Sequence, residues 1–130
     1  MHMKPKIHRA VWASLFLLAV TGCAAPFVRS ELYFGTARAG MPDVSSAEWQ
    51  KFVDEVITPR FPNGLTILDG AGQWRMSDGS LAKEKSHLVI VVHSPTVHET
   101  QKLDEIREAY KQRFNQEAVL EIDEDVRIKF

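Results

Sequence analysis

The chain has 130 residues, of which 45% are hydrophobic and 25% are charged, which predicts one small globular domain. Its first 22 residues hold three of the 16 Lys and Arg residues and none of the 17 Asp and Glu residues, so the remaining 108 carry a net charge of −4. Because phosphate binding needs a basic face, this charge argues against nucleic acid as a partner.

The N-terminal segment has the pattern of a secretory signal. Lys4, Lys6 and Arg9 precede an uncharged apolar run over residues 10–20, and small residues then lead to Cys23. A basic start, an apolar stretch of roughly 7–15 residues and small residues before the cleavage point mark such a signal. The run is shorter than the roughly 20 residues that a transmembrane helix needs.

Cys23 is the only cysteine of the chain, and residues 20–23 (VTGC) resemble the lipobox of bacterial lipoproteins. The resemblance implies that the thiol of Cys23 receives a diacylglycerol, that the signal is cut before Cys23, and that the new amino group is acylated. Val20 departs from the Leu that this family prefers. Ala24, in place of Asp, favours the outer membrane facing the periplasm over the inner membrane.

Two alternatives to lipidation stay open, a buried free cysteine behind an ordinary apolar helix and an uncleaved signal anchor. An exported chain with no second cysteine cannot form an internal disulfide, so Cys23 is free to serve as an anchor. We predict a cleaved signal peptide over residues 1–22, a short lipid-anchored tether over 23–27 and one domain over 28–130.

The rest of the chain alternates between strand and helix patterns. Ser45 with Glu48, and Thr96 with Glu99, have the spacing of capping boxes at helix starts, and Asn115 suits a left-handed cap at a helix end. The patterns predict strands over residues 28–35, 64–75, 83–94 and 117–130, and helices from Ser45 to about 58 and from Thr96 to about 114. This order predicts an α+β, ferredoxin-like sandwich, a four-stranded antiparallel sheet with two helices on one face.

The second face of such a sheet is left to water or to a partner. In the first strand Leu32 and Phe34 point one way and Tyr33 the other. With the alternation that we assign to residues 83–94, the candidate interface on the open face comprises Tyr33, His87, Val89, Val91 and His93. An apolar patch there would imply a homodimer or an envelope protein partner, unless residues 24–29 or the C-terminal tail cover it.

Several segments also carry a resemblance to a known family. They are residues 31–35 (ELYFG), 58–66 (TPRFPNGLT) and 69–74 (DGAGQW), the pair Glu84 and Ser86, and Tyr110 with Phe114 and Gln116. Together they resemble an uncharacterised bacterial family of small secreted proteins and lipoproteins, catalogued as a domain of unknown function. The resemblance covers nearly all of residues 23–130 and implies a single domain, but no activity.

Polar residues around the predicted second and third strands are the candidate ligand-binding residues: Arg60, Asp69, Gln73, Trp74, Glu84 and Ser86. An arginine, carboxylates, an amide and an aromatic ring on adjacent strands can bind a polar small molecule. A carboxylate pair could also act as acid and base if the two pKa values differed. The alternative is structural: Arg60 caps the first helix and pairs with Asp69 or Glu84, while the glycines bend the strand.

We expect no metal and no cofactor. His87 and His93 lie six residues apart on one strand, roughly 20 Å in an extended chain, so they cannot share an ion. Zinc, serine-nucleophile and phosphate-loop motifs are absent from the sequence. The acids over residues 121–125 lack the spacing of a calcium loop and read as a solvated sheet edge.

No motif identifies a reaction, and whether the protein is an enzyme stays open. We predict a lipid-anchored protein of the cell envelope that is a non-enzymatic binding or interaction module, held on the membrane through Cys23. The alternative is a small enzyme or ligand-binding protein with a polar pocket around Arg60, Asp69, Gln73 and Glu84.

Overall fold

The computed structural model describes residues 26–75 and 78–130, and both the predicted signal peptide and Cys23 lie outside this part. The elements follow in the order β1 (Phe27–Gly35), α1 (Ser46–Phe52), η1 (Val53–Ile57), β2 (Thr66–Arg75), β3 (Leu81–His93), α2 (Val97–Phe114) and β4 (Leu120–Val126). Within the described residues, no helix is both long enough and apolar enough to cross a membrane.

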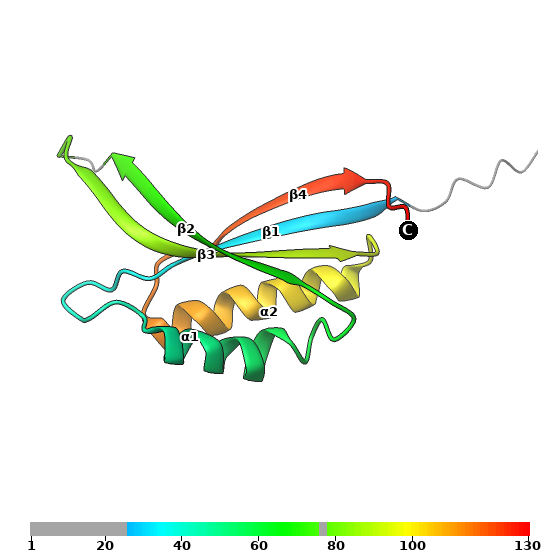
Figure 1. Cartoon of the computed structure of the whole chain (residues 1–130), viewed down its shortest axis with the longest axis horizontal. Helices are drawn as coiled ribbons and strands as arrows, with labels where there is room; N and C mark the ends of the chain where they lie inside the picture. The colour runs from blue at the N-terminus through cyan, green and yellow to red at the C-terminus, as the bar shows by residue number, and fades with distance from the viewer. Residues whose placement is uncertain (1–25, 76–77) are drawn as a thin grey trace, which may run out of the picture.

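The four strands form one antiparallel sheet in the order β2-β3-β1-β4, and both helices cover the same face of it (Figure 1). The predicted α+β, ferredoxin-like sandwich is therefore confirmed. We call the end of the sheet at which β1 begins the base. At the other end β1 stops opposite Ser86, so residues 71–75 of β2 and 78–85, which lead into β3, project beyond it as an arm (Figure 1).

The first helix begins as its sequence predicts. The Glu48 amide donates to Ser45 Oγ at 3.3 Å, and the Ser45 amide donates to Glu48 Oε2 at 2.8 Å, which completes the capping box. The hydrogen bonds from Ser45 hold the pKa of Glu48 below its ordinary value. The helix then widens into the π-helical segment η1, in which the Thr58 amide reaches the Val53 carbonyl at 2.9 Å.

The second helix has only half of its predicted capping box. Thr96 Oγ1 accepts a hydrogen bond from the Glu99 amide at 3.3 Å, but the Glu99 carboxylate binds Lys102 Nζ at 2.8 Å instead of returning to Thr96. At the other end Asn115 takes a φ of 52°, which confirms the predicted left-handed cap.

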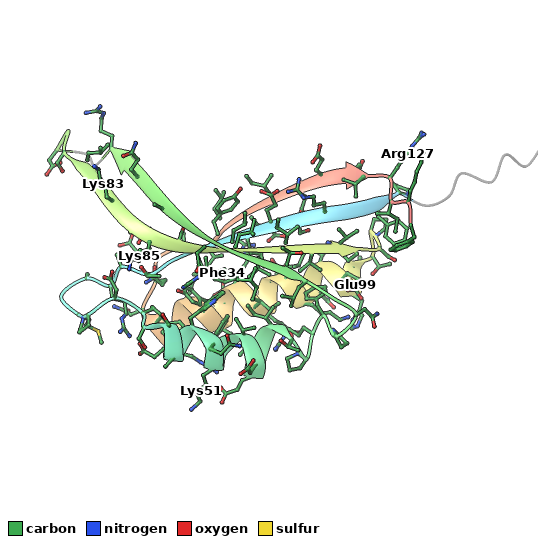
Figure 2. All side chains as sticks on the ribbon, in the orientation of Figure 1. Phe34, Lys51, Lys83, Lys85, Glu99 and Arg127 are labelled. Carbon is green, nitrogen blue, oxygen red and sulfur yellow. The ribbon has the colours of Figure 1, made fainter. Side chains whose placement is uncertain are left out.

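The core lies between the sheet and the helices and is rich in aromatic rings. Phe34 is fully buried at its centre, 4.8 Å from the Tyr110 ring, 5.2 Å from Trp49 and 6.2 Å from Phe52, measured between centroids (Figure 2). Such tilted and edge-on contacts stabilise the packing beyond the area that they bury.

The last strand is shorter than the predicted 117–130. Val126 pairs with Phe27, which is the first residue of β1, so β4 has no neighbour to pair with beyond Val126. β4 begins at Leu120, and the Gln116 side chain before it donates to the Ala37 carbonyl at 2.7 Å.

Candidate functional site

The face of the sheet without helices carries a different set of β3 residues from the predicted one. Val89, Val91 and His93 are buried on the helix side, at 0%, 1% and 7% exposure. The register gives the reason. Directly opposed residues of an antiparallel pair share a face, and Val89 lies opposite the inward Leu32. The prediction that these three residues face away from the helices is wrong.

The remaining members of the predicted interface divide between the two faces. Tyr33 lies opposite Leu88 on the open face, as predicted. His87 lies on the helix side, where its ring stacks on Trp49 with centroids 4.3 Å apart and planes inclined by 6°. Its Nδ1 also lies 2.7 Å from Asp69 Oδ1. His87 thus joins helix α1 to strand β2 and is not available as an interface residue.

The open face carries an apolar strip on β2, β3 and β4, and its β3 and β4 parts meet across β1 at Tyr33, which lies opposite both Leu88 and Leu120. Four of its side chains are between 46% and 57% exposed and two are half-buried. From the register, the residues of the apolar strip are Leu68, Leu88, Ile90, Val92, Leu120 and Ile122. The sequence predicted such a surface on Val89 and Val91, but the structure places it on the alternate set of β3 residues, Leu88, Ile90 and Val92.

The charged groups of the open face largely neutralise one another. Arg29 forms ion pairs with Glu31 and, at 3.7 Å, with Glu124. The Tyr33 hydroxyl donates to Glu31 Oε2 at 2.6 Å. This hydrogen bond raises the pKa of Tyr33 above 10.0, because ionisation would place a second negative charge beside Glu31.

The six predicted ligand-binding residues do not converge on one pocket. Arg60 lies near the base, where its Nε donates to Glu105 Oε2 at 3.0 Å and its Nη1 to the Val56 carbonyl at 2.8 Å. The second bond caps the end of the first helix, as the structural alternative expected, but the ion-pair partner is neither Asp69 nor Glu84. Gln73 lies on the arm, at the end of β2 that is farther from Arg60. The side chain of Trp74 lies outside the described part.

Glu84, Ser86 and Gln73 do lie together, in a shallow hollow of about 450 Å³ where the arm leaves the sheet. Two glycines form part of it, Gly35 and Gly72. The Glu84 carboxylate lies over Gly35 and accepts a hydrogen bond from the Ala37 amide at 3.0 Å. The sequence did not predict this role of Gly35, because a glycine at the end of a strand is equally common where an ordinary loop begins.

We expect Gly35→Ala to destabilise the domain by about 1 kcal/mol, because a Cβ at this position would lie 2.5 Å from Glu84 Oε1 and displace the carboxylate from the Ala37 amide. Gly72→Ala is the matched control, since no atom lies within 4 Å of its added Cβ. Urea unfolding midpoints measure both. Equal midpoints for the two variants would contradict this role of Gly35.

A buried hydrogen-bonded group near the base was also missed. Ser30 Oγ lies 2.8 Å from His93 Nε2 and donates to Asp123 Oδ1 at 2.5 Å, while His93 Nδ1 lies 2.8 Å from the Ser94 carbonyl oxygen. These residue types also occur in hydrolases, but Ser30 is fully buried and its hydroxyl proton is directed to a carboxylate. The group therefore ties β1 to β3 and β4, and it does not present a nucleophile.

Three of the four acids of β4 each bind a different partner. Glu121 pairs with Arg107 at 3.0 Å, Asp123 binds Ser30 and Glu124 pairs with Arg29. Burial, and next the charge of Asp123, raises the pKa of Glu121. Across residues 26–75 and 78–130, no three His, Cys, Asp or Glu side chains are arranged to hold a metal ion.

Fold and surface together define a small ferredoxin-like α+β domain with an exposed apolar sheet face. The chain belongs to the family described as Protein of unknown function (DUF3574), whose model matches residues 29–130. This agrees with the family resemblance of the sequence motifs. No curated protein matches the chain.

Three solved structures are similar in fold. A phage SAM lyase in complex with S-methyl-5′-thioadenosine has 16% identity and a TM-score of 0.58, over 78% of this chain and 81% of that one. The apo phage SAM lyase has 15% identity and a TM-score of 0.59, over 79% and 83%. CutA from Synechococcus elongatus has 10% identity and a TM-score of 0.51, over 78% of each chain. At these identities the likeness shows the fold alone.

Proposed function

We propose that this protein is a lipid-anchored module of the bacterial cell envelope that pairs with a second copy of itself through the open face of its sheet. The observation that carries the proposal is the apolar strip, which lies on β2, β3 and β4 and continues across β1 at Tyr33, on the side away from both helices. Contiguous exposed apolar surface on a small domain marks an interaction site. The anchor rests on the signal and lipobox patterns of residues 1–23, and Ala24 favours the outer membrane facing the periplasm.

The open face is large enough for such a pair. Four strands at a spacing of roughly 4.8 Å make it about 19 Å wide. β1 and β3 pair over eight residues, which is about 26 Å of strand. Each copy therefore contributes about 500 Å², and the pair about 1,000 Å², which is the lower bound for a specific protein interface.

The charges of the open face also favour a second copy as the occupant. Arg29 lies between Glu31 and Glu124, so the three side chains leave a single uncompensated negative charge. Two identical faces can therefore approach without strong like-charge repulsion, which a self-complementary interface requires.

A shared membrane restricts the symmetry of the pair. Cys23 precedes the first strand residue, Phe27, by four residues, so both anchors leave from the base. Two lipids in one leaflet then require both bases to point toward the membrane. The two-fold axis must therefore run along the strands, so residues at the same distance from the base face one another across the pair. Val92 is nearest the base, Ile90 and Ile122 follow, and Leu88, Leu68 and Leu120 are farthest from it.

Co-purification of two differently tagged full-length copies from detergent-solubilised membranes tests the pairing. Val92→Glu is expected to lower the recovered partner at least about tenfold, because it would bury an unpaired charge in the interface. Val92 is 46% exposed, so the fold should tolerate the change.

Leu81→Glu is the matched control, at a comparably exposed apolar residue on the arm and outside the apolar strip. Its recovery should equal that of the parent chain. Recovery that Val92→Glu leaves unchanged, or a parent chain that recovers no tagged partner, would contradict the pairing.

A further inference from the structure

The base of the domain gathers the beginning of the fold and the last residues of the chain. β1 starts there at Phe27, and residues 127–130 return to the same end (Figure 1). Phe27, Phe61 and Val92 line a cleft of about 750 Å³ together with these last four residues. Arg127 lies at this end and Lys83 at the opposite one (Figure 2).

Apolar side chains project into solvent at the base. Phe130 is fully exposed, Val97 is 77% exposed and Ile128 is 38% exposed. Val97 opens helix α2, directly after the end of β3, and so lies beside the same end of the sheet. An exposed aromatic ring with neighbouring aliphatic groups suits the interfacial layer of a bilayer.

The cleft is also basic. Arg60, Lys102, Arg127 and Lys129 line it, and Glu99 supplies the single acidic side chain of the lining. Arg60 and Lys102 are paired with Glu105 and Glu99. Arg127 and Lys129 form no ion pair with any residue that the structure describes, so their charges are available to lipid phosphates. Val97 lines a separate hollow with Asp104 of α2 and with Asp123, Glu124 and Asp125 of β4, so the basic surface of the base is confined to the cleft.

The length of the tether brings the base to the membrane. Phe27 lies four positions after Cys23, and a fully extended chain of four residues spans at most about 14 Å. With a lipid on Cys23, the start of β1 must lie within this distance of the headgroups. No other end of the domain can face the bilayer so closely.

We propose that the base is a membrane-contact surface for an anionic bilayer. The residues over 127–130 (RIKF) alternate in character, so that Ile128 and Phe130 enter the interfacial layer while Arg127 and Lys129 bind lipid phosphates. The contact rests on the proposed anchor at Cys23. It holds each domain upright, with the open face perpendicular to the membrane and accessible to the second copy.

Photo-crosslinking of the full-length protein in intact cells tests this contact. With p-benzoylphenylalanine in place of Phe130, mass spectrometry should find lipid adducts. The same replacement of Leu81, which lies at the far end of the arm, should give none. Arg127→Glu with Lys129→Glu in the Phe130-labelled chain should reduce the lipid adducts at least about fivefold. Phe130 is fully exposed, so labelling it should not disturb the fold.

Membrane retention and the acylation of Cys23 are read from the same cells. A chain that is acylated and retained but gives no lipid adduct at position 130 would overturn the membrane contact and leave the anchor standing. A chain that is neither acylated nor retained would overturn both. Adducts of position 130 with protein alone would also overturn the contact, because another chain would then cover the base.

Discussion

Phe34→Ala is expected to destabilise the domain by about 3–5 kcal/mol, the usual cost of replacing a buried phenylalanine with alanine. Phe34 is fully buried, and its ring contacts Trp49, Phe52 and Tyr110, so the cavity would open at the meeting point of the sheet and both helices. A domain of this size has about 5–15 kcal/mol of stability in total. Thermal unfolding followed by circular dichroism should show a Tm lower by at least about 12 °C.

Leu68→Ala is the matched control on the same sheet, since Leu68 lies on the open face and is about half exposed. Its Tm in dilute solution should remain close to that of the parent. If Phe34→Ala lowered the Tm no more than Leu68→Ala, the assignment of the core to the helix side of β1 would be contradicted.

Cys23→Ser is expected to abolish lipid labelling of the protein completely. The thioether can form only on the Cys23 thiol, and the chain contains no other cysteine. Several acyl chains on one residue anchor a protein stably, whereas a single chain binds only marginally. Without them the protein should leave the membrane fraction. Growth with a radiolabelled fatty acid, followed by fractionation, measures both effects.

Ala24→Ser is the control for Cys23→Ser, because it changes the next residue without removing the thiol. Its labelling and its membrane retention should equal those of the parent chain. Labelling that persists in Cys23→Ser would contradict the lipoprotein assignment, and the proposed membrane contact of the base would lose its anchor with it.

Local chemistry explains what the sequence could predict. The fold class followed from the order of strand and helix patterns, and the Ser45–Glu48 capping box and the left-handed Asn115 both involve residues close in the chain. The second capping box was only half right, because Lys102 offers the Glu99 carboxylate a competing partner one turn further along α2. The spacing of Thr96 and Glu99 alone does not show that a third residue can bind the Glu99 carboxylate.

The sequence of β3 alone could not show which of its two alternating sets of side chains is buried under the helices. Both alternating sets of this strand contain apolar residues, so hydrophobicity does not distinguish the core side from the open side. The polar side chains of His87 and His93 led to the wrong prediction that their set, which includes Val89 and Val91, faces solvent. In the structure they have specific inward partners: Trp49 and Asp69 for His87, and Ser30 for His93. Only the pairing of Leu32 with Val89 determines which set is buried.

The candidate polar pocket failed for a related reason. Arg60 and Glu105 are 45 residues apart, and Ser30 and Asp123 are 93 apart. Contacts at these separations depend on the register of strands and the packing of α2, which no local pattern encodes. Glu84 and Ser86 do lie in one hollow with Gln73, because the hairpin register alone brings β2 and β3 together.

Crosslinking between cysteines placed on the open faces tests the pairing of two copies most directly. Stacked sheets lie about 10 Å apart, so a bis-maleimide of that span should join two Leu88→Cys chains into a covalent dimer in intact membranes. Lys51→Cys, on the exposed side of α1, should give almost none (Figure 2). The parent chain, whose Cys23 thiol is acylated in the proposed form, should also give no covalent dimer. No dimer from Leu88→Cys, or an equal yield from Lys51→Cys, would contradict the pairing through the open face.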